Sequence, residues 1–186
     1  MLKKPSKLQT TIDFEKNGKQ TGYIRLPHSV HRSAYGWLPI PIACIKNGSG
    51  VTALLISGTH GDEYEGQVAL SKLINQLNPE EIQGRVIILP MANFPAAKAG
   101  LRTSPIDEQN LNRIYPGDPD GSPSLMIAHY IESQLLSIAD YGLDLHSGGS
   151  SLHYVPSAVS AVGENKERMK KMKELMKAFA APYSFF

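Results

Sequence analysis

The sequence has little cysteine, few aromatic residues and no long apolar run. Its 186 residues include one cysteine, Cys44, and aromatic side chains make up 8% of the total. One cysteine cannot form a disulfide within the chain, and a thiol inside an apolar segment behaves as a small hydrophobic group. No stretch approaches the roughly 18 apolar residues that span a bilayer, and no apolar signal segment follows the first lysines. These absences favour a cytoplasmic protein.

The sequence also has little excess of positive over negative charge. The formal net charge is +2, and the 41% apolar and 19% charged residues are typical of a globular protein. No basic stretch is interleaved with aromatic residues, so the composition indicates neither a nucleic-acid partner nor a membrane partner. The length suffices for a sizeable core. We expect residues 1–186 to form one domain, with a β-rich lead-in over 1–50 and a core over 51–186.

Apolar runs alternating with turn residues predict an α/β fold. Asn17-Gly18 is a hairpin turn signal between short strands in the N-terminal part. Val51–Ile56 and Arg85–Pro90 are expected to be buried strands, joined by an amphipathic helix over Gln67–Leu77. This order is a βαβ unit, which implies parallel strands. Further along the chain we expect a helix over 123–138, strands over 141–146 and 151–156, and a helix over 165–180.

Two other segments have an unusual content of proline or polar residues. Trp37–Lys46 is expected to be a strand, and Pro39 and Pro41 should confine its start to an edge because proline donates no backbone hydrogen bond. Met91–Asp120 has little apolar periodicity and many Pro, Gly, Asn and Asp residues. A loop of this length inside a compact domain is often functional.

Immediately after the strand Val51–Ile56 come side chains that could bind a metal ion. His60 and Glu63 are three residues apart on a glycine-flanked turn, so an imidazole and a carboxylate can converge there. They make half of a catalytic zinc site of two His and one Glu, which keeps a position for water. The pattern is neither of the helical motifs HExxH and HxxEH. Because it is short, an ordinary surface turn remains an alternative for this pair alone.

The strand Tyr141–His146 ends in the same way, with a histidine followed by a glycine-rich break. Asp144 and His146 point to the same face because side chains alternate along a strand. Asp144 can therefore orient His146, as zinc-bound imidazoles usually require. His60, Glu63 and His146 form a candidate set of ligands for one metal ion at the ends of parallel strands.

Three stretches together resemble the succinylglutamate desuccinylase/aspartoacylase family. They are GTHGDEYEG at 58–66, RTSPIDEQNLNRIYPG at 102–117 and DLHSGG at 144–149. The resemblance runs from about Gly36 to about Pro182. It implies a zinc hydrolase with a carboxypeptidase A-like three-layer fold and a mixed, largely parallel sheet. Within the family the likeness is greatest to the deacetylases of ectoine degradation, which remove acetate from N-acetyl-2,4-diaminobutyrate.

The resemblance also implies roles for individual residues. By position, the ligands of one Zn²⁺ are His60, Glu63 and His146. Arg102 matches the arginine that polarises the scissile carbonyl. The residues that match the pair binding the substrate carboxylate are Asn112 and Arg113. A cation beside the metal stabilises the oxyanion that forms during amide hydrolysis. A second arginine can hold a carboxylate in a bidentate grip.

One part of the family pattern is missing from the sequence. The family's general base is a glutamate on a later strand, and a C-terminal β-rich domain follows it, but no residue up to Phe186 matches either. We expect a zinc-dependent deacylase of small N-acyl amino acids whose chain is truncated before that domain. A metallocarboxypeptidase and an inactive metal-binding fragment remain alternatives. The sequence leaves three questions open: which acyl group is removed, which metal ion is bound, and whether the chain forms a homo-oligomer.

Overall fold

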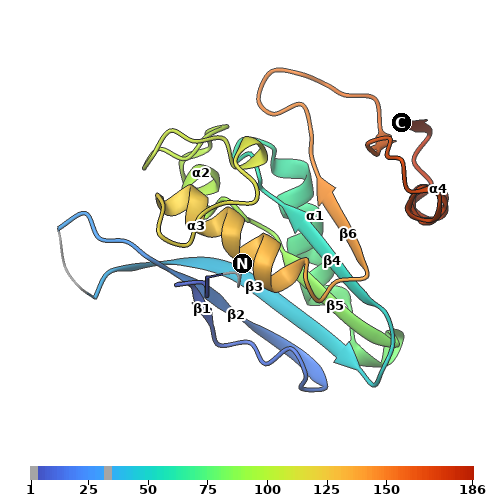
Figure 1. Ribbon diagram of the computed structural model, residues 1–186, viewed down its shortest axis with the longest axis horizontal. Coiled ribbons are helices and arrows are strands. Elements are labelled where there is room, and N and C mark those ends of the chain that lie inside the picture. The colour runs from blue at the N-terminus through green and yellow to red at the C-terminus, as the bar shows by residue number, and fades with distance from the viewer. Residues whose placement is uncertain (1–3, 32–34) are drawn as a thin grey trace. The chain divides into compact units, whose positions relative to one another are not determined.

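The computed structural model describes residues 4–31 and 35–186, in two compact units divided between Ser151 and Leu152. Each unit is described by itself. The first unit contains a six-stranded sheet with the strand order β1-β2-β3-β5-β4-β6 (Figure 1). The strands are β1 (Gln9–Thr10), β2 (Gly18–Pro27), β3 (Trp37–Asn47), β4 (Thr52–Ser57), β5 (Gly84–Leu89) and β6 (Tyr141–Leu145).

The sheet is mixed, and its parallel part consists of β5, β4 and β6. β4 pairs in parallel with β5 on one side and with β6 on the other. The pairs β1–β2, β2–β3 and β3–β5 are antiparallel. Helix α1 (Tyr64–Gln76) connects β4 to β5, so the predicted βαβ unit with parallel strands is confirmed. The helix begins three residues earlier than the apolar periodicity predicts.

Two apolar cores lie on opposite faces of this sheet. Ile87 and Leu89 of β5 pack in one core, together with Ile127 of helix α3 (Pro123–Tyr130). Ile88, between them in the strand, packs in the other core with Leu70 of α1. Alternate residues of a strand point to opposite faces, so α1 and α3 cover the two sides. The expected three-layer arrangement is confirmed.

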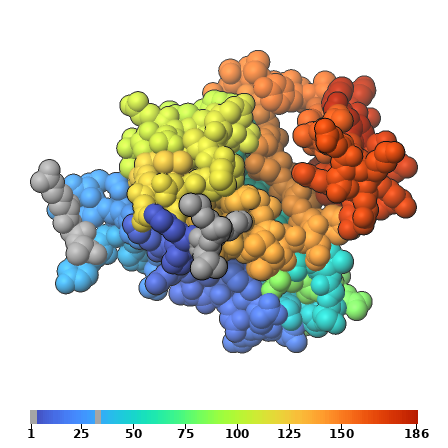
Figure 2. Space-filling model, in the orientation of Figure 1, coloured from blue at the N-terminus to red at the C-terminus, as the bar shows by residue number. Residues whose placement is uncertain are grey.

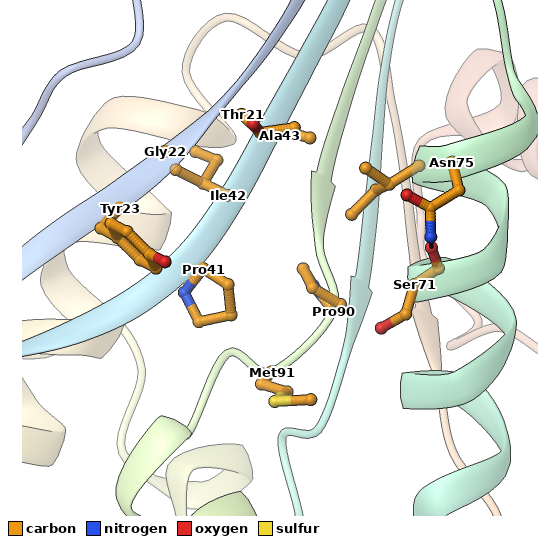
Figure 3. Close-up of a pocket in the computed structure, with 11 residues that line it drawn as sticks. Thr21, Gly22, Tyr23, Pro41, Ile42, Ala43, Ser71, Asn75, Pro90 and Met91 are labelled. Carbon is orange, nitrogen blue, oxygen red and sulfur yellow. Dashed lines mark hydrogen bonds between the residues drawn. The ribbon is translucent and has the colours of Figure 1, made fainter.

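The start of β3 has a strand on one side only. β3 pairs with β2 along its length but with β5 only from Ala43 to Asn47. Pro39 and Pro41 fall in the stretch without β5, as predicted. In the part of β3 before Ala43, β3 and β5 are not paired. A cavity of about 320 Å³ lies there, lined by Pro41 and Met91 among others (Figure 3). Its lining includes none of the candidate metal ligands.

The prediction that Met91–Asp120 lacks regular structure is wrong. The segment contains α2 (Phe94–Ala99) and the 3-10 turn η2 (Leu111–Arg113). Asn93 caps α2 by accepting a hydrogen bond from a backbone N–H, and Gly100 ends it in the left-handed conformation. These capping residues are visible in the sequence, but six residues are too few for a helical apolar pattern.

The predictions for 123–138 and 151–156 have different outcomes. The predicted helix 123–138 is confirmed, with α3 continuing as a π-helical turn over Ile131–Leu135. The predicted strand over 151–156 is wrong, because those residues have no regular structure. The nearest strand is β7 (Ser157–Val159), which belongs to the second unit.

The second unit contains β7, helix α4 (Lys166–Phe179) and β8 (Tyr183–Phe185), and its two strands pair in parallel. The predicted helix is confirmed and begins after Asn165, whose side chain caps it. Among the helices of the described ranges, none has the length and apolar content that crossing a membrane requires.

Candidate metal centre

The order of the strands brings the candidate ligands together. β4 lies between β5 and β6; the connection from β4 to β5 runs through α1, and the connection onward to β6 runs through α3 on the opposite face. Such a reversal leaves a crevice at the carboxyl ends of the strands. The last residues of β4 and β6, Ser57 and Leu145, are paired with each other. His60 and His146 therefore follow neighbouring parallel strands.

Glycine occupies two closely packed positions, one in the turn before α1 and one in the first turn of the helix. A Cβ atom on Gly61 would overlap the backbone of Ala96, and one on Gly66 would lie 3.0 Å from the Cβ atom of Leu145. Gly66 thus lets the start of α1 approach the end of β6. Because Glu63 directly precedes α1, its carboxylate reaches the end of β6.

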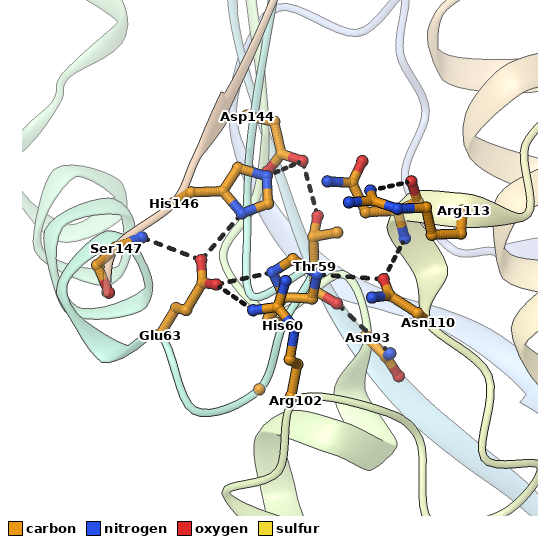
Figure 4. Close-up of polar contacts among 12 residues, drawn as sticks. Thr59, His60, Glu63, Asn93, Arg102, Asn110, Arg113, Asp144, His146 and Ser147 are labelled. Carbon is orange, nitrogen blue, oxygen red and sulfur yellow. Dashed lines mark hydrogen bonds and ion pairs between the residues drawn. The ribbon is translucent and has the colours of Figure 1, made fainter. Parts of the chain in front are cut away.

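The three predicted ligands meet at one point (Figure 4). Nδ1 of His60 lies 2.7 Å from Oε1 of Glu63, and Nδ1 of His146 lies 2.9 Å from Oε2 of the same carboxylate. One ligand atom from each residue lies within 4.8 Å of the others. His60 and Glu63 are buried, whereas the side chain of His146 is 32% exposed. The centre is therefore open to solvent on the side of His146.

The neighbours of His60 indicate its tautomer. The side-chain oxygen of Asn110 accepts the backbone N–H of Asn112 at 3.0 Å, and only the oxygen of an amide can accept. The same oxygen lies 3.1 Å from Nε2 of His60. Nε2 must therefore carry the hydrogen and donate it. In a neutral ring Nδ1 then keeps its lone pair, which points towards Glu63.

Asp144 has the same relation to His146. Its Oδ2 accepts from Nε2 of His146 at 3.0 Å and from the hydroxyl of Thr59 at 2.9 Å. The contact between Asp144 and His146 that strand alternation predicts is present. The hydrogen bond that His146 donates to Asp144 raises the pKa of His146, although burial opposes the shift. Nδ1 of His146 faces Glu63, whose Oε2 also accepts the backbone N–H of Ser147 at 3.0 Å.

These tautomers fit a bound cation. In neutral rings two nitrogen lone pairs face the two oxygens of Glu63 at 2.7 and 2.9 Å, and acceptors at hydrogen-bond distance repel each other. A proton on the ring or a metal ion between the groups removes the repulsion. Two imidazole nitrogens and a carboxylate are a donor set that first-row transition metals, zinc among them, accept. We therefore describe His60, Glu63 and His146 as a candidate metal centre.

The residues predicted to bind substrate lie around this centre. Arg102 donates to Oε1 of Glu63 at 3.2 Å, and its side chain is 54% exposed. Asn112 and Arg113 lie on η2, are exposed, and are linked by a hydrogen bond of 2.9 Å from the guanidinium of Arg113 to the carbonyl of Asn112. They connect to the centre through Asn110, the residue before η2, which bonds to His60.

Sequence reasoning assigned no role to two side chains near the centre. They are Asn110, which accepts from His60, and Thr59, which donates to Asp144. Asn110 is recognisable as a possible cap of η2, because Asn often accepts from the backbone two residues later. Nothing local in the sequence indicates that its oxygen meets His60, fifty residues away along the chain.

The fold and the site together define an α/β protein with a His-Glu-His centre at the carboxyl ends of parallel strands. Residues 49–186 match the model of the succinylglutamate desuccinylase/aspartoacylase catalytic domain. The chain belongs to this family.

Three relatives show how much of a family member is represented. The N-alpha-acetyl-L-2,4-diaminobutyric acid deacetylase of Halomonas elongata is 51% identical over 181 residues, which are 97% of this chain and 53% of that protein. The product-bound ectoine utilization protein EutE (DoeB) of Ruegeria pomeroyi is 47% identical with a TM-score of 0.93, covering 98% of this chain and 56% of that one. A succinylglutamate desuccinylase structure from Silicibacter is 46% identical with a TM-score of 0.93, covering 98% and 55%. The chain spans about half the length of these relatives.

More distant structures show the fold alone. A candidate metallopeptidase from Shewanella amazonensis is 21% identical with a TM-score of 0.56 and covers 77% of this chain and 57% of that one. A candidate carboxypeptidase from Burkholderia mallei is 18% identical with a TM-score of 0.60 and covers 77% and 40%. The expected carboxypeptidase-like fold is confirmed.

Proposed function

We propose that the chain supplies the metal centre of a zinc-dependent deacylase, which hydrolyses the amide bond of an N-acyl amino acid. The observation that carries the proposal is the pair of Nε2–H tautomers, which turn Nδ1 of His60 and of His146 towards Glu63. Family membership and the 51% identity to the Halomonas elongata deacetylase support N-acetyl-2,4-diaminobutyrate as a substrate.

The proposed ligands are Nδ1 of His60, Nδ1 of His146 and the carboxylate of Glu63. Zinc held by these residues would supply Lewis-acid chemistry, making water more acidic and polarising the amide carbonyl. Asn110 and Asp144 accept the Nε2–H groups. Each holds one ring in the orientation that aims Nδ1 at the metal, as partners of metal-bound histidines generally do.

Arg102 is the residue proposed to stabilise the oxyanion. Its guanidinium lies beside Glu63 and is about half exposed, so it can donate to a carbonyl oxygen whose negative charge grows during the reaction. Arg113 and Asn112, exposed on η2, are proposed to hold the substrate carboxylate. A guanidinium fork matches the two oxygens of a carboxylate.

The rate expected of this chain alone is low. No residue of the sequence matches the family's general base, and a positioned base typically contributes about 10²- to 10⁴-fold. We therefore expect the 186 residues to bind metal and to hydrolyse N-acyl amino acids slowly or not at all. Fusion to the C-terminal half of the Halomonas elongata deacetylase should raise the rate. It should also reduce self-association, because the outer edge of β6 lacks a strand partner among the described residues.

The test compares the chain with this fusion. Zinc is measured by elemental analysis, and acetate release is measured with N-acetyl-2,4-diaminobutyrate and N-acetyl-aspartate, with light scattering in parallel. We expect about one zinc per chain in both proteins and faster acetate release from the fusion. Absence of zinc from both would contradict the metal centre. Cleavage of a C-terminal peptide in place of either N-acyl amino acid would favour a metallocarboxypeptidase.

A further inference from the structure

The loop between Arg102 and Arg113 contacts the metal centre near each of its ends. Arg102 donates to Glu63 at 3.2 Å, and the oxygen of Asn110 accepts from His60 at 3.1 Å. The loop and the start of α3 lie side by side on the surface of the first unit, in yellow-green and gold (Figure 2). The position of the loop therefore affects both the ligands and the residues proposed to bind substrate.

The middle of the loop is a turn that closes on itself. The backbone N–H of Ser104 donates to the carbonyl of Gln109 at 3.2 Å, and the N–H of Glu108 donates to the carbonyl of Ser104 at 2.8 Å. Glu108 has a φ of 56°, which is uncommon for a residue other than glycine. Ser104 is fully buried. The turn is compact, but these local bonds do not determine where it lies on the protein.

Asp107 joins this turn to the start of α3. Its Oδ2 accepts the backbone N–H of Ser124 at 2.8 Å, and its Oδ1 accepts the hydroxyl of the same residue at 2.8 Å. Gln109 adds a hydrogen bond of 3.2 Å to the hydroxyl of Ser122. The first N–H groups of a helix lack partners within it, and a carboxylate there also interacts favourably with the helix dipole. Asp107 therefore caps α3 from a position 17 residues earlier.

The helix is a firm anchor for the loop. Ser124 and Ile131 are buried, and Ile127 is 2% exposed in the core under the sheet. Burial alone would raise the pKa of Asp107, yet hydrogen bonds from Ser124, Ser122 and Ser104 lower it below its ordinary value. The carboxylate thus stays ionised at neutral pH and keeps both of its contacts to Ser124.

We propose that Asp107 is a positioning residue for substrate binding. By fixing the loop to α3, it keeps Asn110 on His60 and holds η2, with Asn112 and Arg113, at the side of the metal centre. The part of this inference that concerns substrate rests on the proposed function. The part that concerns the loop does not, so the two can be tested apart.

The experiment uses Asp107→Ala, with Asp107→Asn as the conservative variant. Asp120→Ala is the matched control, since it removes an acidic side chain whose partners, Lys4 and Lys7, lie in the N-terminal segment. Two quantities are measured on the zinc-loaded protein and its variants. They are amide hydrogen exchange over residues 110–113 and the dissociation constant of N-acetyl-2,4-diaminobutyrate by calorimetry.

Asp107→Ala should speed exchange at residues 110–113 and weaken ligand binding, each about tenfold, because hydrogen bonds to a charged group are lost. Exchange in β4 and β5 should not change. Asp107→Asn should resemble the parent in both exchange and affinity more than Asp107→Ala does, since the amide oxygen can still accept from the N–H of Ser124. Asp120→Ala should match the parent.

Two results would overturn the proposal. One is unchanged exchange at 110–113 in Asp107→Ala together with unchanged affinity. The other is exchange that rises equally in all strands, which would show a loss of general stability only. If Asp107→Ala does not fold, Ser124→Ala replaces it and should give the same pattern more weakly. If the parent binds no ligand, the proposed function fails, and exchange still decides the position of the loop.

Discussion

The two sides of the candidate metal centre are held in different ways. His60 and His146 follow β4 and β6, whose backbones are paired with each other. Arg102, Asn110 and Arg113 lie on a loop whose contacts to the metal centre and to α3 are hydrogen bonds of side chains. Backbone pairing distributes the constraint over many bonds, whereas we expect the loop to shift when the carboxylate of Asp107 is removed. Changes on the strand side should therefore affect metal binding first, and changes on the loop side should affect substrate binding first.

Two of the three ligands differ in burial from the residues of η2. His60 and Glu63 are 3% and 4% exposed, and the turn that carries them is in close backbone contact at Gly61. Asn112 and Arg113 are exposed, so water can replace their hydrogen bonds when they move. We therefore expect η2 to move more easily than His60 and Glu63.

The largest effect is expected on the strand side, from His146→Ala. It removes one of three proposed ligands and leaves Oε2 of Glu63 with the backbone N–H of Ser147 but without an imidazole. Zinc per chain should fall from about one to a value not distinguishable from background after dialysis. Elemental analysis gives the measurement. His153→Ala is the control, because His153 is exposed and outside the ligand set. Unchanged zinc in His146→Ala would contradict the assignment.

Gly61→Ala should break the close contact that the strand side requires. The added Cβ atom would overlap the backbone of Ala96, and overpacking of this kind costs about 1–3 kcal/mol in the free energy of unfolding. Gly142→Ala in β6 is the control, because the nearest atom to its added Cβ, on Leu136, lies at 3.5 Å. Urea unfolding should separate the two variants. Equal midpoints would show that the turn can relax.

Asp144→Asn compared with Asn110→Ala measures the two sides directly. Asp144→Asn should weaken zinc affinity about 10- to 100-fold without unfolding the protein, since the carboxylate increases the basicity of His146 as well as orienting it. Asn110→Ala should lie at the lower end of this range, because a neutral amide only orients His60. Competition with a chelator gives both values. Parent-like affinity in Asp144→Asn would remove Asp144 from this role.

The smallest effect is a pH dependence on the loop side. Because the pKa of Asp107 is lowered in the folded protein, its ionised form contributes stability above the unfolded value of about 3.9, and the contribution is lost as the pH falls through the folded value. The difference in unfolding free energy between the parent and Asp107→Asn should be constant between about pH 5 and 7 and shrink below about pH 4. Urea titrations across this range test it. A difference that grows on acidification would contradict the sign.

The strand side was predictable from the sequence because its signals are local. Apolar runs such as Val51–Ile56 predict buried strands, and polar residues that directly follow such runs lie at the edge of the sheet. This pattern indicates His60, Glu63 and His146 without any reference to the family. Alternation along β6 likewise predicted the contact between Asp144 and His146, which the structure contains.

The sequence by itself determined the strands on either side of α1, β6 and the histidines that follow β4 and β6, because these follow from residue patterns shorter than ten positions. Tertiary structure alone decided that β4 lies between β5 and β6, that Asn110 meets His60 and that Asp107 caps α3. These contacts join residues many positions apart. Many groups elsewhere in the sequence could form a hydrogen bond with a given polar side chain of a loop. Only the packing of the whole sheet and its helices brings one of these groups within hydrogen-bond distance.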